Sequence, residues 1–180
     1  MQRRRSKRVE PGENTASTPE QIRARTFQRA VKLLAAKSRS IAELRERLME
    51  RGGSNKTVVD AVIARLREYG YLDDERFAFG YASLKVRQQP IGRRRLERSL
   101  AMKKIDRSVA DEALNQVFAE TSEEELIDRA IEKRLRLRGR PKTRAEAKSL
   151  FDHLLRQGFA FEMVSEKVRA ASQTALDDVE

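Results

Sequence analysis

The segment SIAELRERLMERGGSNKTVVDAVIARL, residues 40–66, decides the fold, because its apolar residues recur at helical spacing on both sides of a pair of glycines. Ser40 followed three residues later by Glu43 is the capping box that typically opens a helix. The glycines at positions 52–53 predict where this helix ends. A further helix is expected over residues 55–69, so the segment predicts two short helices joined by a tight turn.

The same spacing recurs twice further along the chain. In each of three segments, successive key residues are separated by 4, 5, 5, 4 and 4 positions, and the two steps of 5 across the turn are hard to obtain by chance. The three series are Leu44, Leu48, Gly53, Val58, Val62 and Leu66; Leu96, Leu100, Ile105, Ala110, Leu114 and Phe118; and Leu150, Leu154, Phe159, Val164, Val168 and Ser172. A longer helix is expected before each pair, near residues 19–37, 74–88 and 123–138. The pattern therefore predicts a tandem repeat of three-helix units.

The predicted fold is all-α, because no segment shows the alternation typical of a strand. A single unit of this size buries little surface alone, so stacked neighbours must complete each core and the body should be elongated and curved. The expected organisation is a disordered basic tail over residues 1–19, three repeats over 20–72, 73–120 and 121–172, and an acidic tail over 173–180.

The composition narrows the classes of partner and of chemistry. Lys and Arg number 39 against 28 acidic residues, which gives a net charge of +11 and favours a nucleic acid, an acidic protein surface or an anionic membrane as partner. The absence of cysteine excludes disulfides, thiol catalysis and a thiolate zinc site. No apolar run approaches the roughly 20 residues that span a bilayer, and no signal peptide follows the basic N-terminus. We expect a cytoplasmic protein.

Few residues of the sequence could carry chemistry. His153 is the single histidine and has no second histidine or cysteine with which to share a metal. The acids at 73–75 could be a carboxylate cluster, but Asp73 is well placed to cap a helix that begins at Asp74. Gly70 is expected to end the preceding helix. Phosphate-binding and dinucleotide-binding glycine motifs are absent, so we expect no enzyme, no cofactor and no metal.

Two windows of the sequence are strongly basic. Residues 85–107 hold nine Lys and Arg against two acids, and residues 129–148 also hold nine against two. Such runs are usually solvated helix faces, but the run at 93–95 lowers folding stability through repulsion, and guanidinium groups suit two-point contacts with carboxylates or phosphates. We therefore predict a partner-binding surface whose partner is negatively charged. Its candidate residues are Arg93, Arg94, Arg95, Arg98, Lys103, Lys104, Arg134, Arg136, Arg138, Arg140 and Lys142.

Aromatic residues gather where the first two units should meet. They are Tyr69, Tyr71, Phe77, Phe79 and Tyr81. Rings in this arrangement could stack on nucleic-acid bases. Their positions beside apolar helix residues favour a core between the units instead.

Several strings of the sequence match a known family. They are SIAELRERL at 40–48, LREYGYLDDERFA at 66–78, IGRRRL at 91–96 and LLRQGF at 154–159. Over roughly residues 25–170 the chain resembles the RecX family of recombinase regulators, and the Gly-Tyr-Leu-Asp-Asp segment at 70–74 is its most specific part. Two features depart from the family. Gly53 stands where members often carry an apolar or aromatic residue, and the tail at 1–19 lies outside the pattern.

The resemblance implies three three-helix repeats without enzyme activity. Proteins of this family bind RecA and modulate it, most often as inhibitors, in the helical groove of the RecA–DNA filament. RecA and that filament are therefore the implied partners, and weak direct binding of nucleic acid stays open. We expect a monomer with no membrane partner.

Two other classes of function compete with this interpretation. The helices expected at 41–51 and 55–69 have the shape of a helix-turn-helix DNA-binding transcriptional regulator. The second of them is nearly balanced in charge, however, with Lys56, Arg65 and Arg67 set against two acids. The other class is an enzyme acting on nucleic acid, which would need several carboxylates near the basic windows to bind metal ions. Few acids lie there, so this class is disfavoured.

Overall fold

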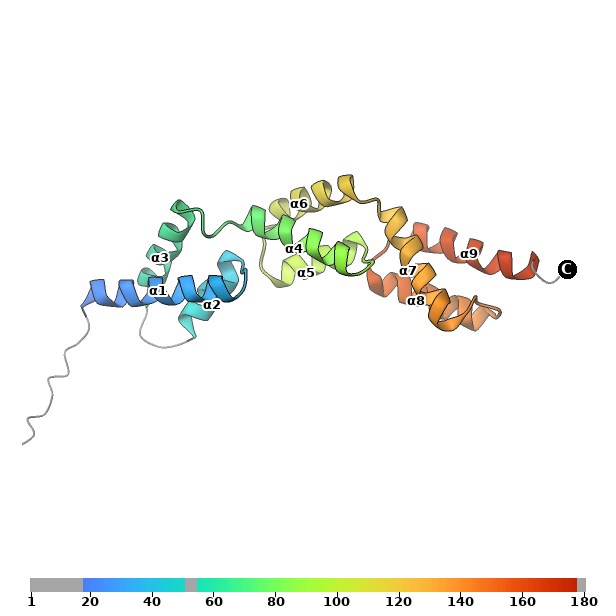
Figure 1. Cartoon of the computed structure of the whole chain (residues 1–180), viewed down its shortest axis with the longest axis horizontal. Coiled ribbons are helices and arrows are strands. Elements are labelled where there is room, and N and C mark those ends of the chain that lie inside the picture. The colour runs from blue at the N-terminus through green and yellow to red at the C-terminus, as the bar shows by residue number, and fades with distance from the viewer. Residues whose placement is uncertain (1–17, 51–54, 178–180) are drawn as a thin grey trace, which may run out of the picture.

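The computed structural model describes residues 18–50 and 55–177 of the chain. Within these ranges every regular element is an α-helix, as the sequence predicts, and the helices form an elongated row (Figure 1). They are α1 (Pro19–Ala36), α2 (Ile41–Met49), α3 (Lys56–Glu68), α4 (Asp74–Gln88), α5 (Arg93–Met102), α6 (Arg107–Glu120), α7 (Glu123–Arg138), α8 (Arg144–Gln157) and α9 (Phe161–Asp177). Residues 1–17 of the predicted basic tail, the glycine pair at 52–53 and residues 178–180 lie outside the described residues, whereas residues 173–177 of the predicted acidic tail belong to α9.

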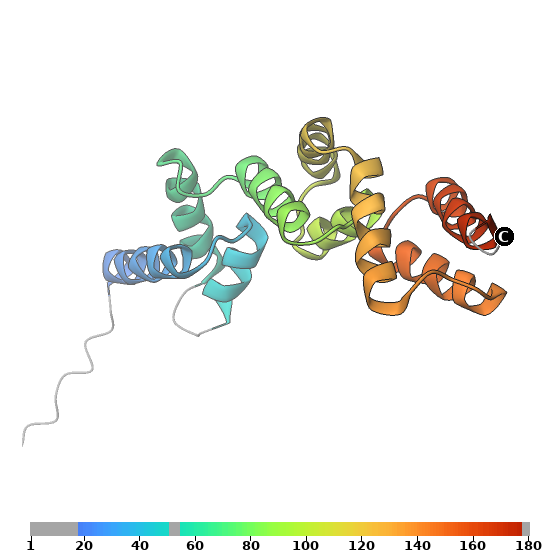
Figure 2. The ribbon, with the colours of Figure 1, turned by 45° about the vertical axis from the view of Figure 1, so that its right-hand side comes forward.

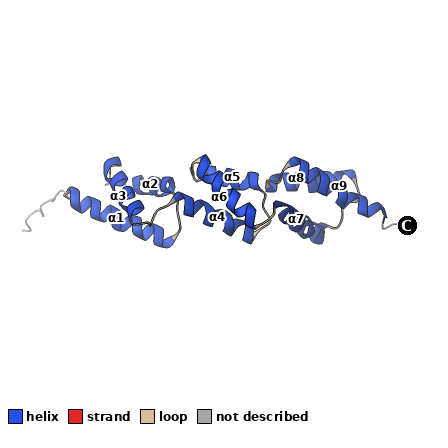
Figure 3. Ribbon diagram, turned by 90° about the horizontal axis from the view of Figure 1, so that it is seen from above, coloured by secondary structure: helices blue, strands red, loops and turns tan. Residues whose placement is uncertain are grey.

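The helices associate in three groups of three, α1–α3, α4–α6 and α7–α9, which we call units 1, 2 and 3. Helix packing is concentrated within each group, most strongly between α4 and α6, between α8 and α9, and between α1 and α3. Figures 2 and 3 show the three units in succession along the long axis of the molecule. The chain is therefore built as a tandem row of helical units.

Local capping interactions fix where the helices begin. Ser40 and Glu43 form the predicted capping box, in which the Glu43 N–H donates to Ser40 Oγ at 3.1 Å and the Ser40 N–H donates to a Glu43 carboxylate oxygen at 3.3 Å. Asp73 caps α4 as predicted, because its Oδ1 accepts from the N–H groups of Glu75 at 2.9 Å and Arg76 at 3.0 Å. Gly70 follows α3 with a φ of +68°, a left-handed conformation that favours glycine.

The repeated apolar positions form the cores. Among the positions of the three series that the structure describes, Phe118 and Ser172 are half-buried and all the others are buried. The buried apolar side chains fall into two separate clusters. One belongs to unit 1, from Ala30 to Leu72, and the other runs without interruption through units 2 and 3, from Phe77 to Val168. Units 2 and 3 therefore share one core, whereas unit 1 has its own.

The apolar spacing of α1 predicts an inward side made of Ile22, Phe27, Ala30, Val31 and Leu34. Ala30 is buried as predicted, but Val31 is 40% exposed and Thr26 is buried. Small side chains at Thr26 and Ala30 let α1 approach its neighbours closely, and the Thr26 hydroxyl is satisfied by donating to the Ile22 carbonyl at 2.8 Å. The inward face is thus rotated away from Val31.

Two of the aromatic residues predicted to fill a core between units 1 and 2 lie at the surface. Tyr69 is 52% exposed and Tyr71 is 63% exposed, so the prediction is wrong for both. They form an edge-to-face row with Phe27 on unit 1. Phe77 is buried in the core of units 2 and 3 instead, stacked on Tyr81 at a centroid distance of 6.0 Å.

Units 2 and 3 are joined by their backbones. The Gly92 N–H donates to the Gln157 carbonyl at 3.0 Å, and the Arg94 N–H donates to the Gly158 carbonyl at 3.2 Å. The two glycines are required by this close approach, because a Cβ atom added to Gly92 would lie 2.4 Å from the carbonyl carbon of Gly158. Backbone hydrogen bonds and a shared apolar core therefore hold units 2 and 3 in one arrangement.

Units 1 and 2 are joined by polar contacts. The Ser40 hydroxyl donates to the Lys103 carbonyl at 2.7 Å, and the Ile41 N–H donates to the Asp74 carboxylate at 2.8 Å. Burial raises the pKa of Asp74 above its usual value, although the hydrogen bond from Ile41 opposes that shift. Because no apolar core cluster of the described residues crosses this boundary, the junction depends on hydrogen bonds and ion pairs.

Candidate partner-binding surface

Arg93 and Arg95 direct their side chains to partners inside the protein. Arg93 Nε lies 3.0 Å from Glu97 Oε1, and a terminal nitrogen of Arg93 donates to Asn115 Oδ1 at 2.9 Å. The Arg95 guanidinium donates to the side-chain oxygen of Gln157 across the junction between units 2 and 3. These two predicted binding residues therefore have structural partners already.

Arg94 and Arg98 are the exposed arginines of α5. They lie one helical turn apart on the same face, and Arg98 Nε donates to the Arg94 carbonyl at 3.3 Å. Two like charges at this spacing oppose helix formation slightly. In the part of the chain that the structure describes, neither guanidinium forms an ion pair with a carboxylate. Both charges are therefore exposed to solvent.

Lys103 and Lys104, at the end of α5, contact unit 1. The Lys103 ammonium lies 2.9 Å from Glu43 and only 5.0 Å from the centre of the Tyr81 ring. Burial acts to raise the pKa of Glu43, but hydrogen bonds from Lys103 and from the Ser40 N–H outweigh burial and hold this pKa below its usual value. Lys104 pairs with Glu46. The two lysines thus stabilise the junction between units 1 and 2.

In unit 3 the end of α7 and the start of α8 enclose a hollow of about 290 Å³, which we call the α7–α8 hollow. Three of the predicted binding residues line it, Arg134, Arg138 and Arg140, together with Ser149. Arg134 donates to the Ser149 hydroxyl at 3.3 Å. The structure therefore brings together two arginines of α7 and one arginine of the turn that follows it.

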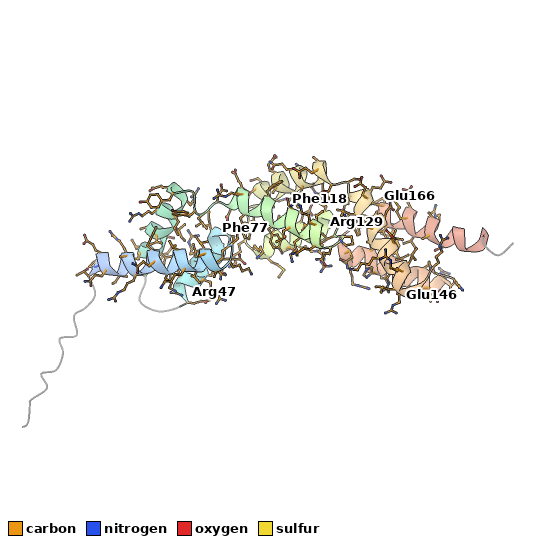
Figure 4. The ribbon with its side chains drawn as sticks, viewed as in Figure 1. Arg47, Phe77, Phe118, Arg129, Glu146 and Glu166 are labelled. Atoms are coloured by element: carbon orange, nitrogen blue, oxygen red, sulfur yellow. The ribbon has the colours of Figure 1, made fainter. Side chains whose placement is uncertain are left out.

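The acidic residue that lines this hollow is Glu146, which Figure 4 labels at the corner between α7 and α8. One of its carboxylate oxygens accepts from the N–H of Lys142 at 2.7 Å and from that of Thr143 at 3.2 Å. Glu146 thereby caps α8. Its carboxylate is committed to backbone groups and forms no described ion pair with the arginines of the hollow.

The remaining predicted residues of unit 3 are exposed. Arg136 pairs with Glu132 at 2.9 Å one turn away on α7, and both side chains are exposed. A pair this open to water contributes little stability. Lys142 is also exposed, in the turn before α8.

Sequence reasoning missed the residues that organise these arginines. Ser149, Asn115 and Gln157 carry no charge and belong to no recognisable motif, and each contacts an arginine at least 15 positions away in the sequence. The available signal for the close junction was a glycine at 92, inside the first basic window, and another at 158, at the end of α8.

The structure gives no support to a catalytic role for His153. Burial lowers its pKa below the usual value, and the positive charge of Arg134 and two other arginines acts in the same direction. Among the described residues no group of three or more His, Cys, Asp or Glu side chains could hold a metal ion.

The helix-turn-helix alternative finds no basic recognition face on α3. Arg65 lies over the rings of Phe27 and Tyr69, 5.2 and 5.3 Å from their centres. On the same helix Asp60 forms an ion pair with Arg45 at 3.1 Å.

No described helix is long and apolar enough to cross a membrane.

A row of three-helix units with basic side chains on its outer surface defines a class of helical-repeat binding proteins. Comparisons with known proteins identify the family. A model described as the first three-helix domain of RecX matches residues 27–66, and one described as its second three-helix domain matches residues 73–114.

Relatives named Regulatory protein RecX match over most of the chain. The Chlorobaculum tepidum protein is 33% identical over 141 residues, which are 78% of this chain and 84% of the relative. The Bacillus licheniformis protein is 29% identical over 139 residues, and the Treponema pallidum protein is 38% identical over 110. The chain spans about half, 52%, of the former relative and 66% of the latter.

A solved structure shares the fold. The crystal structure of RecX from Lactobacillus salivarius superposes with a TM-score of 0.73, covering 84% of this chain and 97% of that chain at 17% sequence identity. The chain belongs to the RecX family. Its relatives in this family are named regulatory proteins.

Proposed function

We propose that this chain binds RecA and the RecA–DNA filament and lowers recombinase activity, and so regulates DNA repair and recombination in the bacterial cytoplasm. Membership of the RecX family supports the choice of partner. The observation that carries the proposal is the display of exposed guanidinium groups on two successive units, from Arg94 and Arg98 on α5 to Arg136 and Arg138 on α7.

An elongated monomer suits a filament because a filament offers the same groups at regular intervals. Cations on two successive units can engage more than one repeat of such a partner, and each contact raises the effective concentration of the next. The targets are acidic RecA side chains, DNA phosphates or both, since guanidinium groups bind either. A protein that holds several filament subunits in one arrangement opposes every step of recombination in which those subunits must rearrange. Such binding therefore inhibits the recombinase.

The test is reversal of the exposed pair on α5. Arg94→Glu with Arg98→Glu should weaken binding to preformed RecA–DNA filaments in a co-sedimentation assay. The loss should be about 0.2–1 kcal/mol per residue if the contacts stay wet, and larger if they are desolvated. Circular dichroism should be unchanged, because both side chains are exposed.

The matched control reverses the same amount of charge on unit 1. Lys32 and Lys56 are both exposed, and their reversal to Glu should leave filament binding nearly intact. If the two double variants lose the same affinity, general charge attraction explains binding. If neither loses affinity, the α5 arginines are excluded from the contact.

A further inference from the structure

The α7–α8 hollow concentrates positive charge at a fixed corner of unit 3. Three guanidinium groups line a space of about 290 Å³, and Glu146 is the acid in that lining. The guanidinium groups of Arg134 and Arg138 alone outnumber this carboxylate, so the lining keeps an excess of positive charge. The carboxylate accepts from the N–H groups of Lys142 and Thr143 at the start of α8.

The turn that forms the hollow has a defined conformation. Gly139 ends α7 with a φ of +75°, a backbone region that favours glycine, and Pro141 two residues later is buried. Arg140, the residue after this glycine, lines the hollow together with Arg134 and Arg138. Proline at a buried position anchors the turn.

The chemistry of the lining indicates what it would bind. Guanidinium groups form two-point hydrogen bonds with phosphate, and the Ser149 hydroxyl adds a further polar group. At this volume the hollow lies near the small end of the range for ligand sites, which suits a single anionic group. Its lining holds no aromatic ring on which a base could stack.

We propose that the α7–α8 hollow is a phosphate-binding site that takes a backbone phosphate of nucleic acid without reading its sequence. This assignment rests on the proposed function for the source of the phosphate, which is the DNA of the filament. It gives the basic residues of unit 3 different roles: Arg134 and Arg138 hold the phosphate, while Arg136, paired with Glu132 outside the hollow, does not.

The chain provides a matched pair of variants for the test. Arg138→Gln and Arg136→Gln each remove one positive charge from the last turn of α7, so both alter the net charge and the helix dipole equally. Of these two arginines, Arg138 lines the hollow and Arg136 does not. Binding of the whole chain to a fluorescent single-stranded oligonucleotide is followed by anisotropy across a salt series, without RecA. Inorganic phosphate at constant ionic strength is the competitor.

We expect Arg138→Gln to lower affinity by about tenfold or more at low salt, as for loss of a charged hydrogen bond. The log–log salt slope should become shallower by roughly 0.7, the value for one single-strand phosphate contact. Arg136→Gln should change both quantities much less. Arg138→Lys should recover part of the affinity, because it restores the charge without the planar fork.

Other results would overturn the site. Equal losses in the Gln variants would mean diffuse attraction, and an oligonucleotide that does not bind the wild-type chain at low salt would remove nucleic acid as the ligand. Displacement by inorganic phosphate in preference to other anions would assign the hollow to a free ion. If Arg138→Gln keeps its oligonucleotide affinity but loses RecA regulation, the hollow contacts RecA and only the proposed function survives. If it loses the oligonucleotide but still regulates RecA, the phosphate site stands alone.

Discussion

On α5 the side chains of Arg93 and Arg95 make hydrogen bonds inside the protein, whereas those of Arg94 and Arg98 extend into solvent. The helical period places Arg94 and Arg98 on one face, because residues four apart share a face. The sequence indicates the total charge of the run. It does not indicate the division of roles, because Gln157 lies 62 positions from the arginine that it binds.

At Asp73 the structure favours a capping role. Asp73→Ala should lower the free energy of unfolding by about 0.5–2 kcal/mol, since the N–H groups of Glu75 and Arg76 lose their acceptor. Urea denaturation measures this loss, and Asp73→Ser should recover most of it. Filament binding per folded molecule should not change. A variant that keeps its stability and loses binding would make the carboxylate functional.

Gly92 should tolerate no side chain. Gly92→Ala places a methyl group 2.4 Å from backbone atoms of Gly158 and Phe159, so it should lower the free energy of unfolding by about 1–3 kcal/mol, as overpacking does. Gly80 is the control, because it lies inside α4 with open space around its Cα. Gly80→Ala should stabilise the protein by about 0.5–1 kcal/mol. Similar effects of the two substitutions in thermal unfolding would show that the junction is not tightly packed.

At the scale of the helices, local chemistry was sufficient to predict most element bounds. The helices expected at 74–88 and 123–138 occur as α4 and α7 with the same bounds, because capping residues and glycines act within a turn of the positions that they control. The rotation of α1 and the exposure of Tyr69 and Tyr71 were not predictable in this way. Each depends on which neighbouring helix meets the element.

The junctions between units were equally hidden in the sequence. That between units 2 and 3 uses backbone groups, which every sequence has, and that between units 1 and 2 uses ordinary surface-type residues such as Glu43 and Lys103. The α7–α8 hollow arises likewise from a turn geometry that charge counting does not reveal. The arginines of the hollow were predicted as binding residues, but their common lining was not.

The contrast between the junctions predicts a hinge. Salt and the substitution Glu43→Gln should loosen unit 1 from unit 2, because the Lys103–Glu43 pair is screened or lost. Units 2 and 3 should stay fixed by their shared core. The chain contains no cysteine, so spin labels can be placed cleanly at exposed sites through Lys32→Cys with Arg87→Cys, and through Arg87→Cys with Glu162→Cys.

Pulsed electron paramagnetic resonance should show that the distance distribution between the labels at positions 32 and 87 broadens as the salt concentration rises. The distribution for the second pair should stay narrow. Lower pH should act like salt once Glu43 is protonated. Because its pKa is depressed in the folded protein, the contribution of the ion pair is present above the unfolded pKa and is lost as pH falls through the folded one. Broadening of both pairs alike would contradict the hinge.

At the scale of the whole molecule, a firm body of units 2 and 3 carries the exposed arginines of the two basic windows, and unit 1 is attached through polar contacts. In a filament groove the body would provide the anchoring cations, while movement of unit 1 would let the chain adapt to the local pitch. Both features belong to the arrangement of the units and to no single helix.

The most direct test of this account is the DNA-dependent ATPase of RecA, measured with the purified chain at substoichiometric amounts. We expect the steady-state rate to fall well below that of RecA alone, because under the proposed function one bound chain would contact several filament subunits. The Arg94→Glu, Arg98→Glu variant should need a higher concentration for the same effect. An ATPase rate unchanged by the wild-type chain, even at a stoichiometric amount and low salt, would contradict the account.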